Sequence, residues 1–71
     1  MLKNGASILA RFVGNHRGIV LATWEKNGRS EYITWTDING DTVDGHYFYT
    51  PKEAIQDFRK RVNYELDNLL L

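Results

Sequence analysis

Two histidines, His16 and His46, are the side chains best suited to acid–base chemistry in this 71-residue sequence. Histidine is the side chain that most readily exchanges a proton near neutral pH. Asp44 stands two residues before His46, and in an extended strand both side chains point to the same face. Such a pair could orient an imidazole for proton transfer. Because no Ser, Cys or third ligand is spaced around it, a strand histidine with local hydrogen bonds is the simpler interpretation.

Residues 37–44 carry closely spaced side-chain oxygens, which hard cations such as calcium require. The spacing does not fit the twelve-residue calcium loop, because Gly40 is fourth rather than sixth and no Glu closes the loop. An Asx/Gly turn is predicted instead. The sequence has no cysteine, which excludes disulfides, thiolate zinc sites and thiol catalysis, and the two histidines lack a metal-ligand spacing. We therefore predict no metal and no cofactor.

Catalysis is the least favoured function. No nucleophile–base pair is visible, Gly-rich phosphate loops are absent, and so short a chain has little room for a concave pocket. We predict a protein that is not an enzyme and has no small-molecule substrate.

The charges are balanced overall, with nine Lys and Arg against nine Asp and Glu. A net charge of zero removes the long-range field that draws many small proteins to nucleic acid. The distribution is uneven, because residues 1–36 hold five basic and two acidic side chains, a surplus of three that the remainder cancels. Any basic surface is therefore expected mostly on the early strands.

Four strands are predicted, over residues 7–13, 18–26, 29–36 and 42–49. Asn27-Gly28 is typical of a two-residue type I′ hairpin turn, because both central positions need positive φ. This turn predicts a register that puts one set of pairs on an aromatic and aliphatic face and the other set on a Thr-rich face. The first set is Lys26 with Arg29, Trp24 with Glu31, Ala22 with Ile33 and Val20 with Trp35. The second set is Thr23 with Tyr32, Leu21 with Thr34 and Ile19 with Thr36.

A helix is predicted over about 51–68, because Thr50-Pro51-Lys52-Glu53 forms a capping box with Pro at the first helical position. Gly45, before it, indicates a bulge or a close backbone approach. An apolar stripe at spacings of three and four is expected to lie on the sheet, formed by Ile55, Phe58, Val62, Leu66 and Leu69 with Ala54 beside them. The basic run 59–61 is expected on a solvated face, in i,i+4 pairs with nearby acids.

The fold class that follows is α+β: an antiparallel β-meander of three to four strands, followed by one C-terminal amphipathic helix packed on one sheet face. The length allows one small domain, residues 1–71, which is marginal in size and gains from self-association. The N-terminus lacks an export signal, and no apolar run is long enough to cross a membrane. With no cysteine, a cytoplasmic location is expected.

The strand-to-helix junction, residues 45–54, reads Gly-His-Tyr-Phe-Tyr-Thr-Pro-Lys-Glu-Ala. It resembles the junction of the three-stranded-sheet-plus-helix DNA-binding domains of tyrosine integrases (the arm-site domain) and plant ethylene-response factors. The likeness covers residues 17–66 in layout and only these ten in detail. It implies a sheet inserted into the major groove, with Arg17, Trp24, Lys26 and Arg29 as the nearest candidates, whereas several acidic side chains on the strands and turns oppose phosphate binding. Arg11 adds to the early basic surface.

Two functions remain open. The first is a small protein-binding module, binding a protein partner or itself as a homodimer, such as an accessory or inhibitory factor of a phage or mobile element. Its predicted interface is formed by spare aromatic and C-terminal leucine side chains: Trp35, Tyr47, Tyr49, Leu70 and Leu71. The alternative is nucleic-acid binding through the exposed sheet face, by Arg11, Arg17, Trp24, Lys26 and Arg29. The deciding observation is whether these basic side chains share one open face with Trp24.

Overall fold

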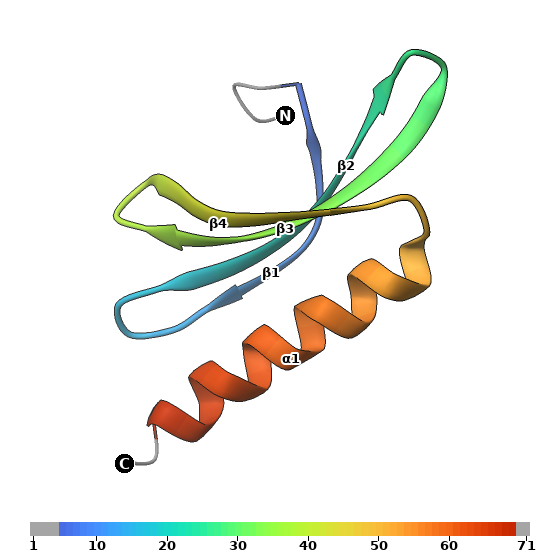
Figure 1. Cartoon of the computed structure of the whole chain (residues 1–71). Coiled ribbons are helices and arrows are strands. Elements are labelled where there is room, and N and C mark those ends of the chain that lie inside the picture. The colour runs from blue at the N-terminus through green and yellow to red at the C-terminus, as the bar shows by residue number, and fades with distance from the viewer. Residues whose placement is uncertain (1–4, 70–71) are drawn as a thin grey trace.

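A computed structural model describes residues 5–69 and has the predicted α+β architecture. One antiparallel sheet has the strand order β1-β2-β3-β4, and helix α1 lies along one side of this twisted sheet (Figure 1). The elements are β1 Ser7–Val13, β2 Gly18–Lys26, β3 Arg29–Ile38, β4 Asp41–Phe48 and α1 Pro51–Leu69. These bounds lie within two residues of those predicted. Within residues 5–69 no helix is long and apolar enough to cross a membrane.

The hairpin between β2 and β3 has the register that its turn predicts. Asn27 and Gly28 have φ of 55° and 76°, as a type I′ turn requires. All seven predicted β2–β3 pairs are present, from Lys26 opposite Arg29 to Ile19 opposite Thr36. The turn therefore fixes which β2 and β3 residues share a face.

The start of α1 also follows from local sequence. The Thr50 hydroxyl oxygen accepts a hydrogen bond from the Glu53 amide at 3.4 Å and donates its own hydrogen to the Glu53 carboxylate at 2.8 Å. Pro51 occupies the first helical position, where its missing N–H costs nothing. The capping box that the sequence predicts is thus confirmed.

The helix lies on the Thr-rich face of the sheet. Thr34 and Thr36, alternate residues of β3, both form hydrogen bonds to side chains of α1. We call this the helix-covered face; it also carries Ile19 and Leu21 of β2. The other side, which we call the helix-free face, carries Val20, Ala22, Trp24 and Lys26 of β2 with their partners on β3.

The orientation of α1 about its own axis differs from the prediction. Ala54 is buried and Phe58 and Val62 are half-buried, but Ile55, Leu66 and Leu69 are 39%, 44% and 41% exposed. The side chains turned to the sheet include Asp57 and Arg61 instead, because the threonine hydroxyls of β3 offer them hydrogen-bond partners. Only part of the predicted apolar stripe lies on the sheet.

Buried apolar side chains lie on both sides of the sheet. On the helix-covered face they are Ile19 and Leu21, and Ala54 of the helix is buried as well. The helix-free face has a cluster of its own, formed by Ala6, Val20, Ala22, Ile33 and Trp35, with Trp24 packed against it. The Trp35 side chain is only 4% exposed, so it is a core residue.

Both outer strands are interrupted by an irregularity. The β1–β2 register shifts between Ile8 and Ala10, and the β3–β4 register shifts opposite Asp44 and Gly45. Asp44 has a φ of 57°, so the predicted bulge is present and its strained residue is Asp44. This bulge sets where Asp44 and His46 stand relative to the helix.

Candidate functional site

A polar cluster joins the helix to the sheet around the carboxylate of Asp57. One oxygen, Oδ2, accepts hydrogen bonds from the Thr34 hydroxyl and from Arg61 Nε, the latter at 3.1 Å, and lies 3.1 Å from His46 Nδ1. The three partners come from β3, α1 and β4. Because Thr34 is fully buried, its hydroxyl needs this acceptor.

Arg61 extends the cluster along the sheet. Its guanidinium donates to the Thr36 hydroxyl at 3.0 Å and to the main-chain carbonyl of Asp44 in the β4 bulge. The side chains of Arg61 and Asp57 are 11% and 19% exposed, so this i,i+4 pair is largely shielded from water. The predicted pairing within the helix is confirmed, but the solvated face predicted for Arg61 is wrong, because β3 and β4 supply acceptors for it.

The electrostatics of the cluster favour a charged Asp57. Burial alone would raise the pKa of this carboxyl group, because it disfavours the charged form. Hydrogen bonds from Thr34, His46 and Arg61, together with the positive charge of Arg61, outweigh burial and hold the pKa of Asp57 below its usual range. Asp57 is thus an ionised carboxylate at neutral pH.

His46 stands between two carboxylates rather than one. Its Nδ1 faces Asp57 of the helix at 3.1 Å, and its Nε2 lies 3.8 Å from Asp44 Oδ1. The predicted partner, Asp44, is therefore the more distant and more exposed of the two, at 74% exposure. Spacing along β4 indicated Asp44, whereas Asp57 is eleven residues away in sequence and becomes a neighbour only through folding.

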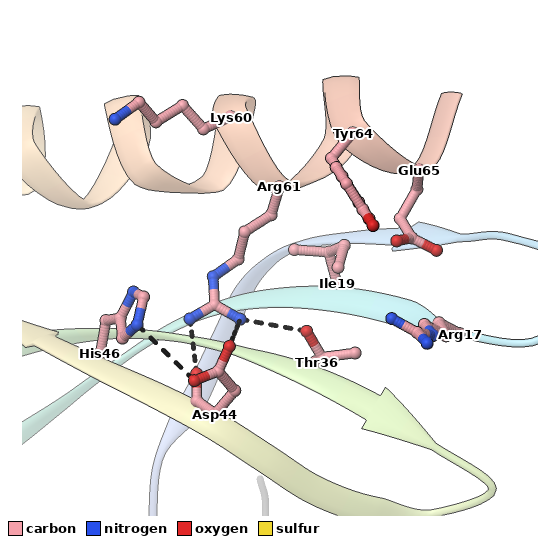
Figure 2. Close-up of a pocket in the computed structure, with 9 residues that line it drawn as sticks. All are labelled: Arg17, Ile19, Thr36, Asp44, His46, Lys60, Arg61, Tyr64 and Glu65. Carbon is pink, nitrogen blue, oxygen red and sulfur yellow. Dashed lines mark hydrogen bonds and ion pairs between the residues drawn. The ribbon is translucent and has the colours of Figure 1, made fainter. Parts of the chain in front are cut away.

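A shallow cavity of about 250 Å³ opens beside the cluster, between α1 and the sheet (Figure 2). Figure 2 shows the Arg61 guanidinium directed down from the helix towards Asp44 and Thr36, with His46 at one end and Arg17 at the other. The hydroxyl that Asp57 could activate is that of Thr34, which is fully buried and cannot reach a substrate. The arrangement fastens the helix to the sheet.

Part of this cluster can be recognised in the sequence. Ala54, Asp57 and Arg61 recur at spacings of three and four, so they lie on one side of a helix. The Thr-rich sheet face offers hydroxyl groups that match such a polar side. The apolar stripe dominated the prediction, and the pairing of these two polar surfaces was missed.

The helix-free face carries four of the five predicted nucleic-acid-binding residues. Arg11 pairs with Val20, and Lys26 with Arg29, all on the face that carries Trp24. Among residues 5–69, neither the guanidinium groups of Arg11 and Arg29 nor the Lys26 ammonium forms a salt bridge. The positive groups on this face are therefore not neutralised by direct carboxylate partners.

Aromatic rings accompany these cations. Lys26 Nζ lies 5.9 Å from the centre of the Trp24 ring, and the Arg29 guanidinium lies 5.8 Å from the centre of the Tyr49 ring. These are cation–π distances. Trp24 also donates its indole N–H to the Glu31 carboxylate at 2.7 Å, which holds the ring in place. The β2–β3 end of the face thus combines fixed rings with positive charge.

Arg17, the fifth predicted residue, lies elsewhere. It follows β1 in the loop before β2 and lines cavities with Tyr64 and Glu65 of the helix, on the helix-covered side. The early basic residues therefore do not form one continuous surface, because the β1–β2 loop directs Arg17 towards α1.

The five residues predicted to form a protein interface do not lie together on one surface of the described chain. Trp35 is buried, so its side chain is not available on the surface of the folded chain. Tyr47 and Tyr49 are 61% and 67% exposed, and their contact with a partner stays a prediction. Leu70 and Leu71 lie outside the described residues.

The turn between β3 and β4 has the structure that its sequence predicts. Asp37 Oδ1 accepts a hydrogen bond from the Gly40 amide at 2.9 Å, and Asn39 and Gly40 have φ of 52° and 86°. The Asp37 oxygen thus holds an Asx turn. Within residues 5–69 no group of three or more His, Cys, Asp or Glu side chains could hold a metal ion.

Comparison with protein-family models, curated proteins and solved structures finds no match for this chain. The likeness of its strand-to-helix junction to integrase and ethylene-response DNA-binding domains therefore stays a prediction.

Proposed function

We propose that this chain is a non-enzymatic binding module whose helix-free sheet face binds nucleic acid. The observation that carries the proposal is that Arg11, Lys26 and Arg29 lie on the same face as Trp24, without carboxylate partners among residues 5–69. Free cations can neutralise phosphate groups and release their counterions, which is the main source of affinity for nucleic acid.

The exposed rings favour single-stranded nucleic acid. Tyr47 and Tyr49 are more than half exposed, and Tyr47 lies opposite Ile33 on the helix-free face. Bases of a single strand can stack on such rings, and this stacking tolerates any sequence. In a duplex the bases are stacked on one another, so the rings would find only edges and backbone.

Two carboxylates on the same face set a limit to the affinity. Glu31 accepts the indole hydrogen of Trp24, and Asp37 accepts the Gly40 amide, so both already have donors. They still repel phosphate, and the net charge of the chain is zero. We therefore expect micromolar rather than nanomolar binding.

The proposal concerns the sheet face alone. Contact of Tyr47 and Tyr49 with a protein partner stays a prediction, and so does a role as an accessory or inhibitory factor of a phage or mobile element. So does the cytoplasmic location.

The test is fluorescence anisotropy with a labelled single-stranded oligonucleotide and the matching duplex, at ~50 and ~200 mM salt. Three phosphate contacts predict a loss of single-strand affinity of about 20-fold over this range. Binding weaker than millimolar at ~50 mM salt, or binding that does not change with salt, would overturn the proposal.

Variants with the same loss of charge identify the surface. Lys26→Ala combined with Arg29→Ala should weaken binding by more than about tenfold, because two phosphate contacts are removed. Arg17→Ala combined with Lys60→Ala removes two positive charges from the helix side of the chain, where both line the cavity of Figure 2. This control should change binding less than about threefold, by the screened long-range charge alone.

A further inference from the structure

A small pocket lies at the end of the β2–β3 hairpin. We call it the hairpin pocket; it has a volume of about 230 Å³ and is lined by Lys26, Asn27, Arg29, Glu31 and Tyr49. In Figure 1 this end of the hairpin projects away from α1. Pockets for drug-sized ligands have about 300–1,000 Å³. The hairpin pocket is therefore of a size for a smaller group.

Glu31 is the one carboxylate that lines this pocket, and it is held in place. Its Oε1 accepts the indole hydrogen of Trp24 at 2.7 Å, and its side chain is half-buried. Among residues 5–69 no second hydrogen bond is formed to this carboxylate. Because a carboxylate has about four lone-pair sites, Glu31 keeps most of its acceptor capacity for a ligand in the pocket.

Cations and an aromatic ring complete the lining. Lys26 and Arg29 are exposed, and neither forms a salt bridge among residues 5–69. The Tyr49 ring is 67% exposed, with the Arg29 guanidinium 5.8 Å from its centre. The pocket thus combines a hydrogen-bond acceptor, positive charge and a surface on which a flat group can stack. A nucleobase with its phosphate group matches all three.

The bases differ in the donors that their Watson–Crick edges offer to a carboxylate. Guanine has two adjacent donors, N1–H and N2–H, so both can bond to one carboxylate. Adenine and cytosine have an amino donor beside an acceptor nitrogen, and thymine and uracil have one N–H between two carbonyl oxygens. Those acceptors would face the carboxylate and repel it. Guanine also has O6 next to N1–H, and O6 is an acceptor that Lys and Arg commonly bind.

We propose that the hairpin pocket binds a guanine base of a single strand. Glu31 accepts N1–H and N2–H in charge-assisted hydrogen bonds, which are about twice as strong as neutral ones. Tyr49 stacks on the plane of the base, and Lys26 and Arg29 contact O6 and the neighbouring phosphate.

This inference rests on the proposed function, because phosphate contacts bring the strand to the helix-free face, and it adds base specificity to that function. It also explains the presence of a carboxylate among the cations. Glu31 weakens the binding of phosphate for every strand, and a guanine base alone compensates for this through two hydrogen bonds.

The test is fluorescence anisotropy at ~50 mM salt with labelled strands of ~6 nucleotides, a length that leaves few binding registers. All positions are thymine except the central one, which is guanine, hypoxanthine, adenine, cytosine or thymine. The guanine strand should bind about tenfold tighter than the all-thymine strand, within the range that one bidentate contact gives. Hypoxanthine is guanine without the 2-amino group, so its strand should have an intermediate affinity.

A variant of Glu31 tests which residue selects the base. Glu31→Gln should reduce the preference for guanine to less than about twofold, because the side-chain amide presents a donor where guanine also presents donors. Glu25→Gln is the matched control, since Glu25 lies opposite Ser30 in the same hairpin but on the other side of the sheet. This control should keep the preference of about tenfold. The ratio of the two affinities is the readout, because a damaged fold would weaken both strands alike.

Free guanosine monophosphate presents the same base with a single phosphate group. It should displace the labelled guanine strand only at more than about tenfold higher concentration than the unlabelled strand does, because it lacks the other phosphate contacts. Equal potency of the two competitors would overturn the assignment of a strand as the ligand.

Equal affinity of the parent for the guanine and all-thymine strands would overturn the inference and leave the proposed function intact. Tighter binding of the adenine or cytosine strand would do the same. A guanine preference that persists in Glu31→Gln would overturn the role of Glu31. Binding of none of the strands at millimolar concentration would remove the proposed function, and the inference with it.

Discussion

The two faces of the sheet both carry charged groups but leave them in different states. On the helix-covered face, Asp57 and Arg61 are bonded to each other and to threonine hydroxyls, and little of either side chain is exposed. On the helix-free face, Arg11, Lys26 and Arg29 have no carboxylate partner among residues 5–69. The first face uses its charges for stability, and the second has charges available for a ligand.

This difference shows why the net charge of so small a chain is a poor guide to the charge that a ligand meets on one of its faces. The helix-free face carries Arg11, Lys26 and Arg29 against Glu31 and Asp37, a surplus of one positive charge that the total of zero hides. A ligand on this face meets a local surplus of positive charge, because interactions over more than about 10 Å through water are screened at ordinary ionic strength.

The largest expected effect is at the buried centre of the helix-free face. Trp35→Ala should cost about 3–5 kcal/mol of unfolding free energy, because it removes the largest side chain of that cluster and leaves a cavity. Domains of this size have only about 4–10 kcal/mol in total, so urea unfolding followed by circular dichroism should find the variant mostly unfolded or close to it. Trp24→Phe, at the partly exposed edge of the cluster, should lose less than about 2 kcal/mol. A loss below about 1 kcal/mol in Trp35→Ala would show that the cluster is not a core.

On the helix-covered face, Asp57→Ala should destabilise the fold by about 2–4 kcal/mol, because the buried Thr34 hydroxyl loses its acceptor and Arg61 loses its shielded carboxylate partner. Asp44→Asn is the matched control, because Asn tolerates the positive φ of this position as Asp does. The Asp44 carboxylate is 74% exposed and 3.9 Å from Arg61, so loss of its charge should cost less than about 1 kcal/mol. Equal losses in the two variants, measured by urea unfolding, would contradict the central role given to Asp57.

Acid should lower the stability that Asp57 gives to the contact between the helix and the sheet. The pKa of Asp57 is lower in the folded chain than in the unfolded chain, so its contribution to stability is complete above the unfolded value of about 4. That contribution is lost as pH falls through the lower, folded pKa. Urea midpoints measured from pH 6 to pH 2 should therefore fall more steeply in the parent than in Asp57→Asn. Parallel curves would contradict the prediction.

The smallest expected effect is that of Glu31→Gln, on the helix-free face. Glu31→Gln removes a negative charge beside Trp24, while the amide oxygen can still accept the indole hydrogen. Stability should change by less than about 1 kcal/mol. Affinity for a single-stranded oligonucleotide without guanine should rise about two- to fivefold, because one repulsion with phosphate is gone. Anisotropy that shows unchanged or weaker binding would mean that phosphate does not approach this edge.

Local sequence was sufficient for the elements and for the central register. Asn27-Gly28 permits one tight turn, and that turn decides which residues of β2 and β3 are opposite. Thr50 to Glu53 determine the start of the helix. Both predictions concern residues within a few positions of each other, where steric and hydrogen-bond rules apply directly.

The helix rotation and the Asp57 cluster could not be predicted in the same way. Asp57 meets Thr34 across 23 residues, and Arg61 meets Thr36 across 25. Hydrophobic spacing favoured the predicted apolar stripe as the buried side of the helix, whereas hydrogen bonds to the β3 threonines turn a polar side towards the sheet. The position of Arg17 was missed for a related reason, since a loop direction depends on packing against the helix.

The most direct test of the central claim is an amide and indole NMR titration with a single-stranded oligonucleotide at ~50 mM salt. The chain has two tryptophans, so its two indole signals report separately on the partly exposed Trp24 and the buried Trp35. The claim predicts that the Trp24 indole and the amides of Lys26 and Arg29 shift, while the amides of Arg17 and Lys60 stay in place. Shifts centred on Arg17 and Lys60, or no shifts at millimolar oligonucleotide, would contradict the assignment of the helix-free face as the binding surface.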